Sequence, residues 1–133
     1  MKNIGIWLDK DKALIFKLTD NTEVFETIIS NVENFHAHGG SGTRLKGGPQ
    51  DVIQDSKYLE REKHQFKAYF KEIAIEIEKA DGILIFGPAE VKDKFKKELE
   101  DSYSEIAAKV KAVQVADSMT DNQVKAWVRD FFK

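Results

Sequence analysis

The feature that most constrains the fold is a continuous apolar run, "GILIFG", at residues 82–87. Its apolar residues do not alternate with polar ones, which is typical of a parallel strand buried on both faces. Apolar residues at helical spacing flank it: Phe66, Phe70 and Ile73 before it, and Val91 and Phe95 after it. A buried strand between two amphipathic helices predicts an α/β fold with helical crossovers between parallel strands.

The N-terminal part of the chain shows strand periodicity instead. In "NIGIWLD" at 3–9 the aliphatic residues Ile4, Ile6 and Leu8 alternate with Gly5 and Trp7, and further strand-like stretches follow at 13–18 and 23–30. Short polar segments at 9–12 and 19–22 separate them, as expected for turns. These residues are predicted to form a three-stranded antiparallel meander.

The rest of the pattern completes the predicted order of elements. A long helix is expected to begin at Asp55 or Ser56, and a last strand lies within 108–117. Thr120 and Gln123 fit a capping box, and the helix after it should bury Val124, Trp127, Val128 and Phe131. The order β-β-β-α-β-α-β-α, with a mixed five-stranded sheet in a three-layer domain, is that of a ribonuclease H-like α/β fold.

Composition limits the classes of function. The 133 residues are enough for one domain, 1–133, and the absence of cysteine excludes disulfides and thiolate catalysis. No apolar run is long enough to span a membrane and the N-terminus does not resemble a signal peptide, so we expect a cytoplasmic protein with no membrane partner. The net charge of −2 argues against general coating of nucleic acid, and no DNA partner is expected.

Residues 31–54 show no periodicity and are predicted to form a long functional loop. Structureless segments longer than about 12–15 residues are uncommon in compact domains and are usually functional or disordered. The stretch "HAHGGSGTRLKGGPQ" at 36–50 has five of the eight glycines, two cations and no acid. It is predicted to bind RNA, because glycines allow close approach of the backbone and cations contact phosphates. The candidate RNA-binding residues are His36, His38, Gly39, Gly40, Arg44, Lys46, Gly47 and Gly48.

The position of "GGPQ" at 47–50, after a meander and before a long helix, resembles the middle domain of archaeal and eukaryotic peptide-chain release factors. That domain carries a Gly-Gly-Gln motif on a ribonuclease H-like fold. The stretches "GIWLDKDKALIF", "ILIFGPAEVKDKF" and "VADSMTDNQVKAWVRDFF" extend the resemblance over nearly the whole chain, which also looks like small single-domain bacterial relatives described as translational-machinery proteins. The resemblance implies a ribosome-linked task, such as rescue or stress, with ribosomal RNA or tRNA as partner.

The same resemblance implies a role for one side chain. In the release factors the two glycines enter the peptidyl-transferase centre and the glutamine positions a water against the peptidyl-tRNA ester. Gly47 and Gly48 match the glycines, and Gln50 is the candidate catalytic residue. Pro49 interrupts the motif, restricts Gly48 and displaces Gln50 by one position. Two functions therefore remain open: an RNA-binding accessory factor without catalysis, and a peptidyl-tRNA ester hydrolase.

The sequence leaves three other interpretations open. Two-metal nuclease chemistry needs several strand-end carboxylates, and the sequence offers Asp9 and Asp117. A zinc site could use His36, His38 and His64, although paired loop histidines are weak evidence and no metal or cofactor is expected. A protein-interaction module without RNA affinity is the third alternative. The sequence does not indicate the oligomeric state.

Overall fold

A computed structural model describes residues 2–32 and 48–133, with side-chain surroundings for residues 2–32 and 60–133. The strands are β1 (Asn3–Leu8), β2 (Lys12–Leu18), β3 (Glu23–Ile29), β4 (Gly82–Gly87) and β5 (Val110–Val115). The described helices are α2 (Gly48–Ile77), α3 (Val91–Ser102), the one-turn α4 (Ser104–Ala107) and α5 (Asp121–Phe131). The prediction of an α/β fold is confirmed.

The five strands form one mixed sheet in the order β3-β2-β1-β4-β5. β1, β2 and β3 are the predicted antiparallel meander, with Gly5 opposite Phe16 and Phe16 opposite Phe25. β4 and β5 join in parallel, as predicted, and Asn3 of β1 pairs with Gly82 of β4. Every residue of β4 is buried, in agreement with its uninterrupted apolar sequence.

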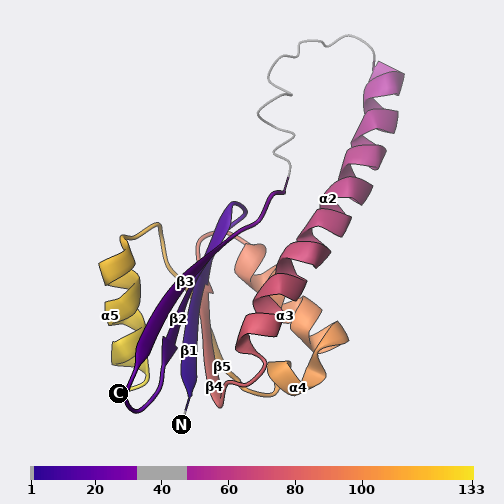
Figure 1. Cartoon of the computed structure of the whole chain (residues 1–133). Coiled ribbons are helices and arrows are strands. Elements are labelled where there is room, and N and C mark those ends of the chain that lie inside the picture. Colours follow the sequence, from indigo (N-terminus) through magenta and orange to yellow (C-terminus); the bar gives the residue numbers. More distant parts are fainter. Residues whose placement is uncertain (1, 33–47) are drawn as a thin grey trace.

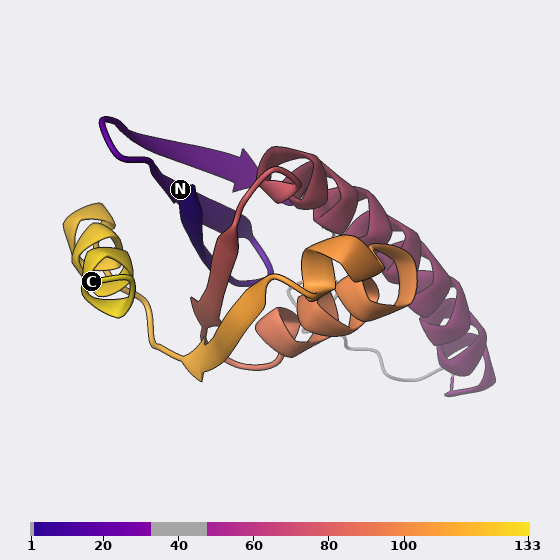
Figure 2. The ribbon, with the colours of Figure 1, turned by 90° about the horizontal axis from the view of Figure 1, so that it is seen from below.

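Helices cover both faces of the sheet (Figures 1 and 2). On one face α2, α3 and α4 pack on a buried cluster that includes Ile6, Phe70 and Phe95. On the other face α5 packs on a second cluster, which includes Trp7 and Val128. The alternation in β1 sends Ile4, Ile6 and Leu8 into the first cluster and Trp7 into the second, because successive strand residues point to opposite faces.

One edge of the sheet collects the carboxyl ends of four strands. β3 is antiparallel to β2 and therefore runs parallel to β1, as do β4 and β5. Asp9, Ser30, Pro88 and Ala116 all follow strand ends at this edge. The segment between β3 and α2, which contains most of the candidate RNA-binding residues, leaves the sheet here.

The predicted start of the long helix is wrong, because α2 begins at Gly48 rather than at Asp55 or Ser56. Residues 48–54 of the predicted loop are therefore helical, and residues 33–47 lie outside the described part of the chain. Pro49 is compatible with this result: its fixed φ suits the first turn of a helix, where an N–H has no intrahelical partner in any case. The one-turn helix α4 was also missed, since four residues are too few to show a period.

The amino-terminal part of α2 extends beyond the sheet (Figure 1). Phe66 is the first buried residue of the helix among residues 60–77, and residues 60–65 are exposed or half-buried. From Phe66 onward the predicted apolar stripe is confirmed, with Phe70, Ile73 and Ile77 all buried. At about 1.5 Å per residue, Gly48 lies about 27 Å along the helix axis from Phe66.

The predicted capping box of α5 is confirmed. Gln123 N–H donates to the Thr120 hydroxyl oxygen at 3.2 Å, and Thr120 N–H donates to Gln123 Oε1 at 2.8 Å. Val124 and Val128 are fully buried, as predicted. The prediction that Trp127 is buried is wrong, because 36% of this residue remains exposed. It lies at the border of the apolar stripe, which is centred on Val124 and Val128.

Candidate RNA-binding site

The candidate residues are divided between described and undescribed parts of the chain. Gly48 and Gln50 belong to the first turn of α2, so "GGPQ" enters a helix rather than closing a loop. The remaining candidates lie outside the described residues: His36, His38, Gly39, Gly40, Arg44, Lys46 and Gly47. The structure does describe the elements on either side of this segment, which are the end of β3 and the start of α2.

The first end is fixed where β3 stops. Ser30 is buried, its hydroxyl donates to the carbonyl oxygen of Lys10 at 2.6 Å, and its N–H donates to the carbonyl oxygen of Asp11 at 2.9 Å. Val32 N–H donates back to Ser30 Oγ at 3.2 Å. Asn31 has a φ of 57°, a left-handed conformation that asparagine tolerates better than most residues. The chain therefore leaves the sheet through a turn tied to the β1–β2 hairpin.

The same hairpin is tied to α2. Tyr69 donates its hydroxyl to the carbonyl oxygen of Asp9 at 3.1 Å, and Lys10 forms an ion pair with Glu62 at 3.4 Å. Burial, with the nearby charges of Asp9 and Asp11, raises the pKa of the Tyr69 hydroxyl far above its usual value. This hydroxyl therefore remains a protonated donor at neutral pH. The β1–β2 turn thus connects the end of β3 to the middle of α2.

A second tight turn at this edge joins β4 to α3. Gly87 has a φ of 155°, and a Cβ atom there would lie 2.3 Å from the carbonyl oxygen of Leu8. Ala89 has a φ of 51°, and the buried Lys92 donates its ammonium to the carbonyl oxygen of Ala89. These contacts make "GPAE" at 87–90 a tight strand-to-helix turn. Only a glycine lets β4 pass this close to the end of β1.

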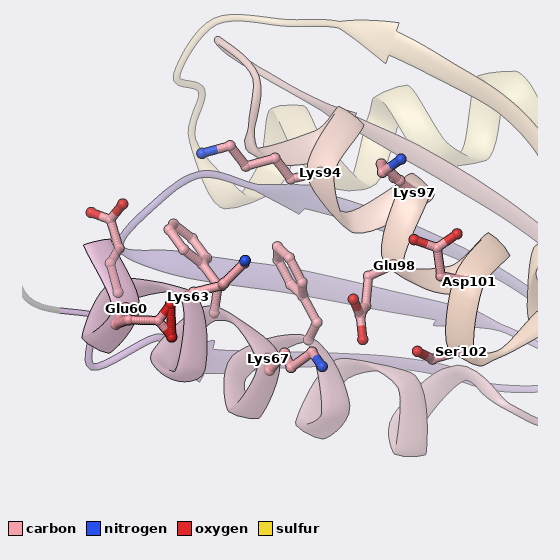
Figure 3. Close-up of a pocket in the computed structure, with 11 residues that line it drawn as sticks. Glu60, Lys63, Lys67, Lys94, Lys97, Glu98, Asp101 and Ser102 are labelled. Carbon is pink, nitrogen blue, oxygen red and sulfur yellow. The ribbon is translucent and has the colours of Figure 1, made fainter. Parts of the chain in front are cut away.

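A groove runs between α2 and α3 beside this edge (Figure 3). Its volume is about 590 Å³, and the buried residues Phe66 and Phe70 are part of its lining. Both helices contribute lysines to it, and acidic residues accompany them: the lining includes Lys63, Lys67, Lys94, Lys97, Glu60, Glu62, Glu98 and Asp101. Lys94 Nζ lies 5.3 Å from the centre of the Phe66 ring. The sequence did not predict this groove, because charged residues such as Glu60 and Lys63 are equally typical of a solvated helix face.

The two metal interpretations gain no support from the described residues. Asp9 Oδ1 accepts from the N–H groups of Asp11 and Lys12 at 2.8 and 2.9 Å, which makes it a hairpin-turn aspartate. The carbonyl oxygen of Asp117 accepts from Trp7 Nε1 at 3.2 Å. His64 is exposed, with Glu60 at 4.0 Å. Within the described part of the chain, no three His, Asp or Glu side chains are grouped as metal ligands.

Comparison with solved structures identifies proteins that share the fold. The archaeal translation termination factor aRF1 superposes with a TM-score of 0.60 at 12% identity, over 94% of this chain and 32% of that one. The Pelota protein of Thermoplasma acidophilum gives 0.57 at 17% identity, over 97% and 32% of the two chains. Pelota of Archaeoglobus fulgidus gives 0.58 at 13% identity, over 97% and 31%.

These values define the class of fold: an α/β arrangement that also occurs in a translation termination factor and in Pelota proteins. The chain spans about a third of the length of each of these proteins, and at such low identity the likeness concerns the fold. No family model and no curated protein matches the sequence. No helix in the described residues is both long and apolar enough to cross a membrane.

Proposed function

We propose that this protein is a cytoplasmic, ribosome- or tRNA-associated accessory factor that binds RNA through residues 36–50. The proposal rests on the fold of the chain taken together with the position of its glycine-rich cationic stretch. Nearly the whole chain has a fold found in a termination factor and in Pelota, and its glycine-rich cationic stretch lies between β3 and α2. In the finer form of the proposal, the chain is a single ribonuclease H-like domain akin to the Gly-Gly-Gln domain of release factors.

The turn at Ser30 and the length of α2 support this proposal. One end of the segment leaves a turn held by Ser30, and the other continues into α2, whose first residue lies about 27 Å from Phe66 along the helix. A helix of this kind can carry its tip into a narrow space while the sheet stays outside. Arg44 and Lys46 would contact phosphates, and the glycines and histidines would approach the bases and the backbone.

The test is co-sedimentation with ribosomes over a salt series, for the natural chain and for Arg44→Glu/Lys46→Glu. Loss of about two phosphate contacts should make the negative slope of log K against log salt shallower by about 1.4–1.8, in addition to weakening binding. The matched control is Lys79→Glu/Lys111→Glu, which makes the same charge change at exposed positions near the opposite edge of the sheet.

Equal weakening by both double variants would reduce the effect to net charge and contradict the assignment of the segment. Binding that is unaffected by Arg44→Glu/Lys46→Glu would contradict it as well. If ribosomes are not bound even at low salt, the protein-interaction alternative replaces the RNA-binding one.

A second function, hydrolysis of the peptidyl-tRNA ester, is favoured by one observation. Gln50 lies in the first turn of α2, where unpaired N–H groups and the helix dipole give a partial positive charge that could stabilise an oxyanion. The test is peptide release from ribosomes loaded with peptidyl-tRNA. Release by the natural chain that is abolished by Gln50→Ala supports hydrolysis, and equal release by Gln50→Ala contradicts it.

A further inference from the structure

A second groove lies on the other side of the sheet, between the end of β5 and α5. Its volume is about 590 Å³, similar to that of the groove between α2 and α3. α5 packs against β1 and β2, on the face of the sheet away from α2 and α3 (Figure 2). The residues that matter here are Val115, Asp117, Met119, Ala126, Trp127 and Asp130.

Trp127 forms the most distinctive wall of this groove. Its ring is stacked on Phe86, with centroids 5.5 Å apart and planes inclined by 6°, and its Nε1 donates to Gln114 Oε1 at 2.8 Å. These two contacts fix the ring in one orientation although 36% of the residue is exposed. A ring held in this way offers its second face without further loss of side-chain entropy on binding. Val115, which is 73% exposed, adds aliphatic surface nearby.

The charged residues that line this groove are acidic. They are Asp117 and Asp130, and none of the described lysines and arginines belongs to the lining. The cations of α5 are held on its other side: Arg129 forms a two-bond ion pair with Glu23 at 2.7 and 3.0 Å, and Lys125 lies over the Phe25 ring at 5.1 Å. Lys133 approaches Asp130 at 3.9 Å, and both side chains are strongly exposed. The groove is therefore aromatic, aliphatic and acidic.

We propose that this groove binds a basic segment of a partner protein, with an arginine or lysine over the exposed face of Trp127. The cation is attracted by the ring and by the two carboxylates, and a neighbouring aliphatic side chain of the partner packs on Val115 and Met119. RNA fits poorly, because its phosphates would meet Asp117 and Asp130. None of the residues that line this groove belongs to residues 36–50, so variants of the two surfaces can be tested independently.

The experiment follows the two indole N–H signals by NMR, since the chain has two tryptophans and Trp7 is buried. The probe is the peptide acetyl-Leu-Arg-Leu-Arg-amide, and its matched control carries the neutral isostere citrulline in place of each arginine. The Trp127 signal, assigned with Trp127→Phe, should shift saturably with the arginine peptide. The Trp7 signal should respond only weakly, through the hydrogen bond from Trp7 Nε1 to the carbonyl oxygen of Asp117. Asp117→Asn/Asp130→Asn should weaken binding about three- to tenfold, because partly exposed charge pairs contribute modestly.

Each outcome decides the proposal. Saturable binding that needs both the arginines and the two carboxylates supports it. Equal shifts with the citrulline peptide, unchanged affinity in Asp117→Asn/Asp130→Asn, or no saturation at millimolar peptide overturns it. A shift of the Trp127 signal with oligouridine instead of the peptide also overturns it and assigns the groove to RNA. Because neither aspartate belongs to residues 36–50, failure here leaves ribosome binding by that segment unaffected.

Discussion

The packing of α5 on the sheet depends on a glycine in the central strand, and this dependence can be measured. A Cβ atom on Gly5 would lie 2.2 Å from Val128 Cγ2 and 2.8 Å from Val128 Cγ1, well inside van der Waals contact. Val128 is fully buried, so it has little room to withdraw. Gly5→Ala should therefore cost about 2 kcal/mol in free energy of unfolding, the middle of the range for overpacked cores.

The reasoning predicts that a second substitution relieves the first. Val128→Ala alone removes two methyl groups and should cost about 2 kcal/mol, from lost transfer free energy and the cavity left behind. In the double variant the new methyl group at position 5 enters the space that Val128 vacated. The total cost should then be about 2 kcal/mol rather than about 4 kcal/mol, an interaction energy of about 2 kcal/mol.

The assay is equilibrium unfolding in urea, with thermal unfolding as a second measure. For 133 residues, the usual entropy of unfolding makes 2 kcal/mol correspond to a fall of about 7 °C in Tm. The control pairs Gly5→Ala with Val124→Ala, a buried residue of the same helix that is not among the atoms nearest to the added Cβ. That pair should be additive. Additivity within about 0.5 kcal/mol for Gly5→Ala/Val128→Ala as well would refute the steric account.

Three further predictions concern the sheet edge, an ion-pair cluster and the last helix. Gly87→Ala should lower stability by about 1–3 kcal/mol in urea unfolding, because its Cβ would meet the Leu8 carbonyl oxygen at a φ of 155°; an unchanged midpoint would contradict this. Burial alone would lower the pKa of Lys17, but hydrogen bonds to Glu76 and Glu26 outweigh it and raise this pKa, and the bond from Lys17 lowers the pKa of Glu76. The stability contributed by Glu76 is thus present above its unfolded pKa near 4.5 and is lost as the pH falls through its lower folded pKa. The stability contributed by Lys17 is present below its unfolded pKa of 10.5 and is lost as the pH rises through its higher folded pKa. Lys17→Met should therefore flatten both the acidic and the alkaline limb of a profile of unfolding free energy against pH. Thr120→Ala should cost about 1 kcal/mol by removing the cap of α5, which Thr120→Ser should largely preserve in the same assay.

Much of the fold could be predicted because its signals are periodic. The alternation of Ile4, Ile6 and Leu8 and the spacing of Phe66, Phe70, Ile73 and Ile77 encode burial directly, and both were confirmed. The start of α2 could not be found in the same way. Glycine and proline normally interrupt helices, yet Pro49 is favourable in a first turn, and the apolar stripe gives no sign that the helix continues past the sheet.

The candidate site was less accessible to sequence reasoning. Residues 36–46 stand out by composition alone, which predicts a binding chemistry but no geometry. The turns at Ser30 and Gly87 depend on contacts with residues about 20 and 79 positions away in sequence, and no local pattern announces them. Trp127 was assigned to the core by its spacing, although the ring reaches past the border of α5 onto Phe86.

The placement of β1 at the centre of the sheet has a consequence for synthesis. β1 pairs locally with β2, but its other neighbour is β4, and Asn3 pairs with Gly82. During translation, at about 5–20 residues per second, roughly 4–16 s pass between the emergence of these two strands. Over this interval one edge of the apolar strand "NIGIWL" has no native partner, and it is open to pairing with other chains. The nascent protein is therefore most prone to aggregation before residue 87 has emerged, and stalling before that point should favour misassembly.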